Sequence, residues 1–161
     1  MLNKFLLLSI LATLLCSCDS APNYVHNLPQ NADLVGTWIL TKDAAESLRQ
    51  IGTDLDGEHN LQLNADGTFV IVGMPNLFLS QTTNAKFYSA TGKWHVDRAN
   101  WYWQITLQFE TLNQDNAMFF SFIPIENQNP PYSLHMIYGD RSDNFFYPFV
   151  RTDPSRVNIK R

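Results

Sequence analysis

The sequence predicts an all-β protein, namely an antiparallel up-and-down β-barrel of about eight strands with one short helix after the first strand. Runs of alternating apolar and polar residues recur along the chain, and most are separated by short clusters rich in Asn, Asp and Gly. No intervening segment offers a helix of the dozen or more residues that a parallel crossover requires. Such a meander closes into a barrel or folds into a sandwich, and we expect closure because about eight strands make a compact barrel.

The first strand and the helix are expected between residues 34 and 52. The run 34–40 (LVGTWIL) is typical of a strand whose alternate side chains share one face. Asp43 and Glu46 resemble a capping box, in which the aspartate accepts from a helical N–H and the glutamate reaches back. The pattern therefore predicts a short helix over about 44–51, ended by Gly52.

The other strands follow in order over residues 59–63, 68–73, 86–97, 101–110, 117–125, 132–139 and 144–151. The turn at 64–67 (NADG) predicts a hairpin, because Gly67 tolerates a positive φ. Residues 98–100 and 139–144 are further turn clusters. The strand 101–110 alternates most regularly, so one of its faces should be buried and the other wet.

The run 145–150 (FFYPFV) is apolar on both faces. Pro148 cannot donate to a strand ladder, which favours an edge or a bulged position. One face would lie under the helix while the other joins the barrel interior. Alternatively, the outward face meets a protein partner.

The first 17 residues have the composition of a secretory leader. Lys4 supplies the positive charge, and residues 5–15 are apolar except for Ser9 and Thr13. This apolar run is shorter than the roughly 20 residues that cross a bilayer, which argues against an uncleaved membrane anchor.

The end of this leader, Leu15-Cys16-Ser17-Cys18, resembles the lipobox of bacterial lipoprotein signal peptides. The resemblance implies that the sulfur of Cys18 carries diacylglycerol and that the chain is cut just before it. Cys16 is the less favoured candidate for this modification, because Leu15 would then occupy a position that the pattern fills with a small residue. Asp19 resembles the inner-membrane retention residue of enteric lipoproteins, while the outer membrane remains possible. We therefore expect a protein held by membrane lipid on the periplasmic side.

Composition divides the remainder into a tether, one domain and a tail. Residues 18–33 are polar with two prolines and are predicted to be a flexible tether carrying the lipidated cysteine. Residues 34–152 form the barrel, and 153–161 form a basic C-terminal tail. Both cysteines lie in or beside the leader, so no disulfide is expected within the barrel. The net charge is −4 without any basic stripe, which argues against nucleic-acid binding.

Gly36-Thr37-Trp38, at the start of the first strand, resembles the Gly-x-Trp opening of lipocalins and of lipocalin-like bacterial lipoproteins. The resemblance implies that Trp38 plugs the closed end of the barrel. It also implies that Arg151 packs on the indole ring by a cation–π contact. Three further pieces are similar to parts of such lipoproteins: residues 63–69, 92–94 and 138–140. The chain lacks the lipocalin disulfide and long C-terminal helix.

No catalytic or metal-binding spacing is present. The four histidines form no zinc motif, and His95 and His135 are expected to be satisfied strand residues. Asp54, Asp56 and Glu58 alternate, so in an extended segment their carboxylates would project to one side, as calcium ligands do. The full calcium-loop pattern is missing, however, and a solvated loop is expected. No nucleophile elbow, phosphate loop or dinucleotide fingerprint occurs. We therefore expect no enzyme activity, no metal and no cofactor.

Leu77, Phe78 and Leu79 are apolar residues in a predicted connection, where such clusters form a ligand mouth, a lid or extra core over the barrel end. The main functional hypothesis is a lipid-anchored barrel that binds a small apolar ligand. The alternative is an interaction protein, such as an inhibitor, immunity or assembly factor, that engages another envelope protein. The third hypothesis is that the protein is a hydrolase. An open apolar interior would favour the ligand, and a filled interior would favour the partner.

Overall fold

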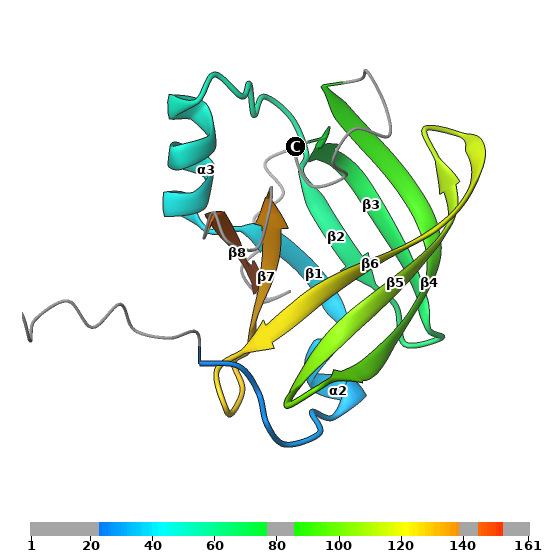
Figure 1. Ribbon diagram of the computed structural model, residues 1–161. Coiled ribbons are helices and arrows are strands. Elements are labelled where there is room, and N and C mark those ends of the chain that lie inside the picture. Colours follow the sequence, from blue (N-terminus) through cyan, green and yellow to red (C-terminus); the bar gives the residue numbers. More distant parts are fainter. Residues whose placement is uncertain (1–22, 77–85, 139–144, 153–161) are drawn as a thin grey trace, which may run out of the picture.

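Eight antiparallel strands form a closed barrel and follow one another around it in chain order (Figure 1). The computed structural model describes residues 23–76, 86–138 and 145–152. The strands are β1 (Gly36–Leu40), β2 (Asn60–Leu63), β3 (Thr68–Pro75), β4 (Phe87–Ala99), β5 (Tyr102–Leu112), β6 (Asp115–Glu126), β7 (Ser133–Tyr138) and β8 (Phe145–Arg151). The last strand closes the barrel by pairing with the first, with Trp38 opposite Arg151. The predicted fold class is confirmed.

The strand β5 shows how the alternating pattern builds the barrel wall. Ile105, Leu107 and Phe109 point to the interior and are fully buried, as the alternation of 101–110 predicts. The opposite face is not wet as predicted, because Tyr102, Gln104 and Thr106 on it are also buried. The hairpin between β5 and β6 is tighter than predicted. Asn113 and Gln114 both have positive φ, which is the backbone of a two-residue hairpin turn.

The N-terminal segment is packed against the barrel from residue 23 onward. Its polar composition predicts a tether over 18–33, but the described part of that range is held in place. Val25 donates its N–H to Ile125 O and accepts from Trp103 N, both at 2.9 Å, so it bridges β6 and β5. Its side chain is fully buried in the core. One apolar side chain and two backbone hydrogen bonds thus outweigh the local composition.

A short helix, α2 (Asn31–Leu34), covers the end of the barrel at which β1 begins (Figure 1). Leu34, which the pattern assigned to the first strand, is the buried last residue of this helix. The strand itself begins at Gly36. The same end of the barrel carries the β4–β5 and β6–β7 turns (Figure 1).

The predicted helix after β1 is α3 (Lys42–Gln50), and it lies at the opposite end of the barrel (Figure 1). Its N-cap differs from the prediction. Thr41, in an extended backbone conformation, accepts the N–H of Ala44 on its hydroxyl at 3.2 Å. The N-cap therefore lies two residues before the predicted one, and Asp43 lies inside the first turn, where its negative charge interacts favourably with the helix dipole.

Two apolar clusters fill the structure. The larger one lies inside the barrel and draws on all eight strands. The smaller one joins α3 to the barrel through Ala44, Leu48, Leu55 and Tyr147. Tyr147 lies under the helix, but it shares its face of the strand with Phe149, which is buried in the barrel core. Val150 on the opposite face is 39% exposed, so the prediction that opposite faces of the 145–150 run meet the helix and the interior is wrong.

Candidate binding surfaces

The three residues that the lipocalin resemblance singled out meet at the α2 end of the barrel. Trp38 is fully buried and donates its indole N–H to Leu34 O at 2.8 Å. Gly36 has a φ of +139°, and a Cβ there would lie 3.1 Å from the Cδ of Arg151. The glycine thus lets the arginine stem pass close to β1.

The guanidinium of Arg151 binds backbone rather than an aromatic ring. Its Nη1 donates to the carbonyls of Ala32, Asp33 and Val35 at 3.3, 3.0 and 3.3 Å. The structure records no cation–π contact between Arg151 and Trp38, both of which are described. The side chain of Arg151 therefore ties the last strand to α2.

The described part of the barrel interior is filled by side chains. A cavity that holds a water molecule leaves accessible surface on the side chains around it. Most inward side chains have almost none, whereas Ala117, Phe119 and Ser121 on the inward face of β6 are partly exposed. Those exposed by 1% or less are Trp38, Leu61, Leu63, Phe69, Ile71, Met74, Ile105, Leu107, Phe109, Ile123, Ile125, Leu134 and Phe149. These residues therefore border no water-sized internal space.

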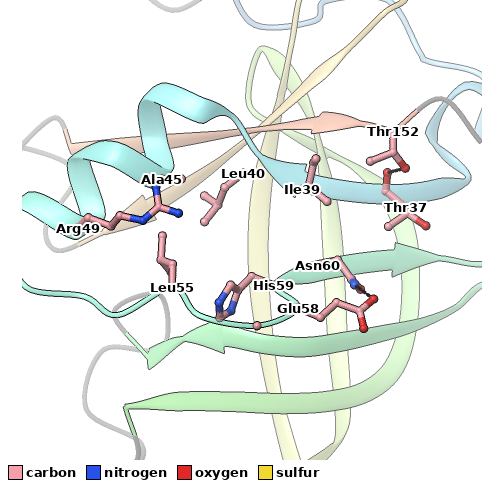
Figure 2. Close-up of a pocket in the computed structure, with 11 residues that line it drawn as sticks. Thr37, Ile39, Leu40, Ala45, Arg49, Leu55, Glu58, His59, Asn60 and Thr152 are labelled. Atoms are coloured by element: carbon pink, nitrogen blue, oxygen red, sulfur yellow. Dashed lines mark hydrogen bonds between the residues drawn. The ribbon is translucent and has the colours of Figure 1, made fainter. Parts of the chain in front are cut away.

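A groove of about 510 Å³ lies outside the barrel, between β1, β2 and α3 (Figure 2). This volume is within the range of small-molecule sites. One part of its lining is apolar, from Ile39, Leu40, Ala45 and Leu55. The other part is polar and carries both charges. Its members are Thr37, Arg49, Glu58, His59, Asn60 and Thr152.

Most polar groups of the groove are held by neighbours. Asn60 donates its amide to Glu58 Oε1 at 2.6 Å, and His59 hydrogen-bonds Gly73 O through Nδ1. The imidazole of His59 also stacks on Phe87, with ring centroids 5.3 Å apart. Arg49 is solvent-exposed, and its ion pair with Glu46 is long at 3.9 Å. The groove therefore offers an exposed cation beside an apolar wall.

The remaining polar candidates have structural roles. His135 pairs with Glu126 at 2.9 Å between Nε2 and Oε2, which confirms a satisfied strand position. Asp54 accepts the N–H of Asp56 at 3.1 Å and so forms a turn. Among the described residues, no group of three or more His, Cys, Asp or Glu side chains could hold a metal ion.

The outer face of β6 carries an apolar ridge that the sequence reasoning missed. Met118, Phe120 and Phe122 project outward with exposed fractions of 88%, 53% and 47%. In the described residues β6 pairs with β7 only at Ile125 and Glu126. The edge of β6 beside the ridge is therefore not paired with any described strand. We call these three residues the β6 ridge.

The predicted lid and lipidation residues lie outside the described part of the chain. They are Cys18, Asp19, Leu77, Phe78 and Leu79. No helix among the described residues has both the length and the apolar character needed to cross a membrane. Comparison with known proteins found no matching family model, no matching curated protein and no matching solved structure.

Proposed function

We propose that this chain is a lipid-anchored, non-catalytic protein of the bacterial cell envelope whose barrel binds another envelope protein through the β6 ridge. The leader and the Cys18 pattern support the anchor. The observation that carries the interaction is the exposure of Met118, Phe120 and Phe122 on a strand whose edge no described strand pairs.

The packing of the barrel argues for an external surface rather than for carriage inside. The fully buried inward side chains of the described strands leave no water-sized space beside them. A small apolar ligand held among them would need to displace well-packed core, which is costly. Because the interior is filled, a protein partner is favoured over a small ligand carried inside the barrel.

The chemistry of β6 fits a partner that adds a strand. Residues 117–123 (AMFFSFI) contain no charge and no proline. Exposed edge strands of soluble proteins usually carry charged residues or proline, because an uncharged apolar edge pairs with other chains. An extended segment can hydrogen-bond to the edge and place alternate apolar side chains against the ridge. We therefore expect a partner segment of alternating apolar residues.

Position-specific crosslinking in intact cells tests this interaction. A photoreactive phenylalanine analogue at Phe120 should give a discrete crosslinked species. The same analogue at Lys93, which is exposed on the outer face of β4, is the matched control and should not. Equal products at both positions, or none at Phe120, would contradict the proposal. The combined Met118→Ser, Phe120→Ser and Phe122→Ser variant should stay folded and lose the binding of that partner.

The anchor has its own test. Mass spectrometry should find diacylglycerol on an N-terminal Cys18, and Cys18→Ser should release the protein from the membrane fraction. Density fractionation then places it, and Asp19 favours the inner membrane over the outer. An intact leader or an unmodified thiol would refute the anchor while leaving the β6 interaction open.

The groove beside α3 supports a second candidate function, the binding of a small amphipathic anion. Its apolar wall from Leu40, Ala45 and Leu55 adjoins the exposed guanidinium of Arg49. Anilinonaphthalene sulfonate combines an apolar body with one negative charge and is a suitable probe. Arg49→Gln should weaken its binding, and Ala45→Trp, which fills the groove, should abolish it. Binding that neither variant alters would place the probe elsewhere.

A further inference from the structure

The α2 end of the barrel carries exposed aromatic and apolar side chains that the core does not use. Trp101, in the β4–β5 turn, is 54% exposed, and Leu28 is 64% exposed. The partly exposed Tyr24 and the buried Tyr102 lie beside Trp101 and support it. We call these four residues the aromatic end. Residues 23–30 run along this end of the barrel (Figure 1).

The aromatic end is a fixed surface rather than a set of loose side chains. Tyr24 stacks on Tyr102 with ring centroids 4.6 Å apart, and Trp101 lies 5.6 Å from Tyr24 and 5.1 Å from Tyr102. His26 hydrogen-bonds the carbonyl of Trp101 at 2.9 Å through Nδ1. The rings are therefore held together at the point where the N-terminal segment meets the barrel.

The length of chain before this point limits its distance from the expected anchor. Five residue steps separate Cys18 from Asn23, and a fully extended chain spans at most about 3.6 Å per residue, or roughly 18 Å in total. Asn23 in turn accepts the N–H of Asn127 on its carbonyl at 3.0 Å, so it is fixed beside the β6–β7 turn. An acylated Cys18 would thus lie at most roughly 18 Å from Asn23, which keeps the α2 end of the barrel near the membrane surface.

We propose that the aromatic end lies in the headgroup region of the bilayer that holds Cys18, so that the barrel stands on its α2 end. This inference rests on the proposed anchor. Tryptophan and tyrosine favour the membrane interface because one part of each ring is apolar and another is polar. The short tether makes this contact intramolecular, so weak partitioning of Trp101 and Leu28 is sufficient.

The charges at this end favour a contact that depends little on salt. Asp97 and Arg98 are adjacent and exposed, and their charges are opposite. The guanidinium of Arg98 lies 5.9 Å from the ring centroid of Trp103. The side chain of His26 is exposed, and that of Glu126 is paired with His135. Among the described residues of this end, no net positive patch is available to bind anionic lipid by charge alone.

An environment-sensitive fluorophore on a single cysteine tests the orientation. The full chain is expressed, processed and reconstituted into vesicles of phosphatidylethanolamine and phosphatidylglycerol. Cys16 is then lost with the leader and Cys18 is acylated, so an introduced cysteine carries the only free thiol. A nitrobenzoxadiazole probe at Leu28→Cys should emit at shorter wavelength and be quenched by doxyl-labelled lipid. Probes at Met118→Cys and Lys93→Cys should remain water-like and unquenched.

A second substitution separates a role of Trp101 from simple proximity. Adding Trp101→Ser to Leu28→Cys should reduce the lipid quenching to the level at Lys93→Cys, while the protein still floats with the vesicles. A water-like Leu28→Cys probe on a floating protein would overturn the orientation. So would a blue shift without lipid quenching, which indicates a protein contact, or stronger quenching at Met118→Cys. A protein that does not float would instead show that the anchor itself is absent.

Discussion

Arg151 joins the last strand to the segment that covers the α2 end of the barrel. Its Nη1 donates to the carbonyls of Ala32, Asp33 and Val35. Arg151→Met keeps the apolar stem and removes these hydrogen bonds. We expect a loss of about 1 kcal/mol in the free energy of unfolding, less than for a buried charged donor because the side chain of Arg151 is exposed. Urea denaturation measures this loss.

Arg49→Met is the matched control for that change. The ion pair of Arg49 with Glu46 is long and exposed on both sides, so its removal should cost about 0.5 kcal/mol or less. Equal losses in the two variants would mean that the carbonyl contacts of Arg151 add nothing to stability.

Tyr88 gives the fold a dependence on alkaline pH. Burial raises the pKa of its phenol well above the ordinary value of 10. The folded protein therefore keeps the proton longer than the unfolded chain does. The stabilisation is fully present below pH 10 and is lost as the pH rises above it, by about 1.4 kcal/mol per unit.

Denaturation at pH 8 and pH 11 with Tyr88→Phe measures this effect. The variant should lose less stability than the wild type over this range. Part of the loss remains, because burial and the charge of Asp33 also raise the pKa of Tyr132. Identical pH profiles would show that Tyr88 ionises without unfolding the protein.

At the scale of elements, α3 offers a direct comparison of sequence and structure. The sequence places the N-cap at Asp43, whereas in the structure Thr41 accepts from Ala44 N. Thr41→Ala should lower the free energy of unfolding by about 1 kcal/mol, as is usual for loss of an N-cap. Asp43→Ala should cost much less, because only a favourable charge near the helix dipole is lost. A larger loss for Asp43→Ala than for Thr41→Ala, in thermal or urea unfolding, would show that Asp43 is the N-cap after all.

Strand order and hairpins were predictable because period-two alternation and turn residues are local signals. Asn64 to Gly67 illustrates this, since Gly67 takes a φ of +81° in the predicted turn. The packing of Val25 was not predictable, because its partners Ile125 and Trp103 are distant in sequence. A single apolar residue in a polar run gives no local indication that it joins the core.

The β6 ridge was missed for a related reason. In residues 117–123 both faces are apolar, so alternation alone does not say which face is outside.

Gly92 is a further residue whose role could not be predicted, since its sequence context says nothing of its packing. A Cβ there would lie 2.0 Å from Gln108 O, beside the bulge in β5. The close approach depends on a register shift that only the three-dimensional pairing defines.

At the scale of the molecule, the two proposals use different parts of one strand. The β6–β7 turn belongs to the α2 end, where the aromatic end would meet the bilayer (Figure 1). Phe122 and Met118 are four and eight residues back along β6 from Glu126, or about 13 and 26 Å at 3.3 Å per residue. A barrel standing on its α2 end would therefore present the ridge above the headgroups, where an envelope partner can reach it.

The filled interior predicts how the barrel responds to small apolar molecules. Phe109 is fully buried, with Phe119 stacked at 4.1 Å and Phe69 edge-on at 5.1 Å. Phe109→Ala should cost about 3–5 kcal/mol and leave an apolar cavity. Saturating benzene should then raise the melting temperature of this variant but not of the wild type, because only the variant offers space. Phe120→Ala, on the outer face of β6, is the control and should gain no response. A wild-type barrel that is stabilised by benzene would contain an open cavity, and carriage of a small ligand inside it would again be the better proposal.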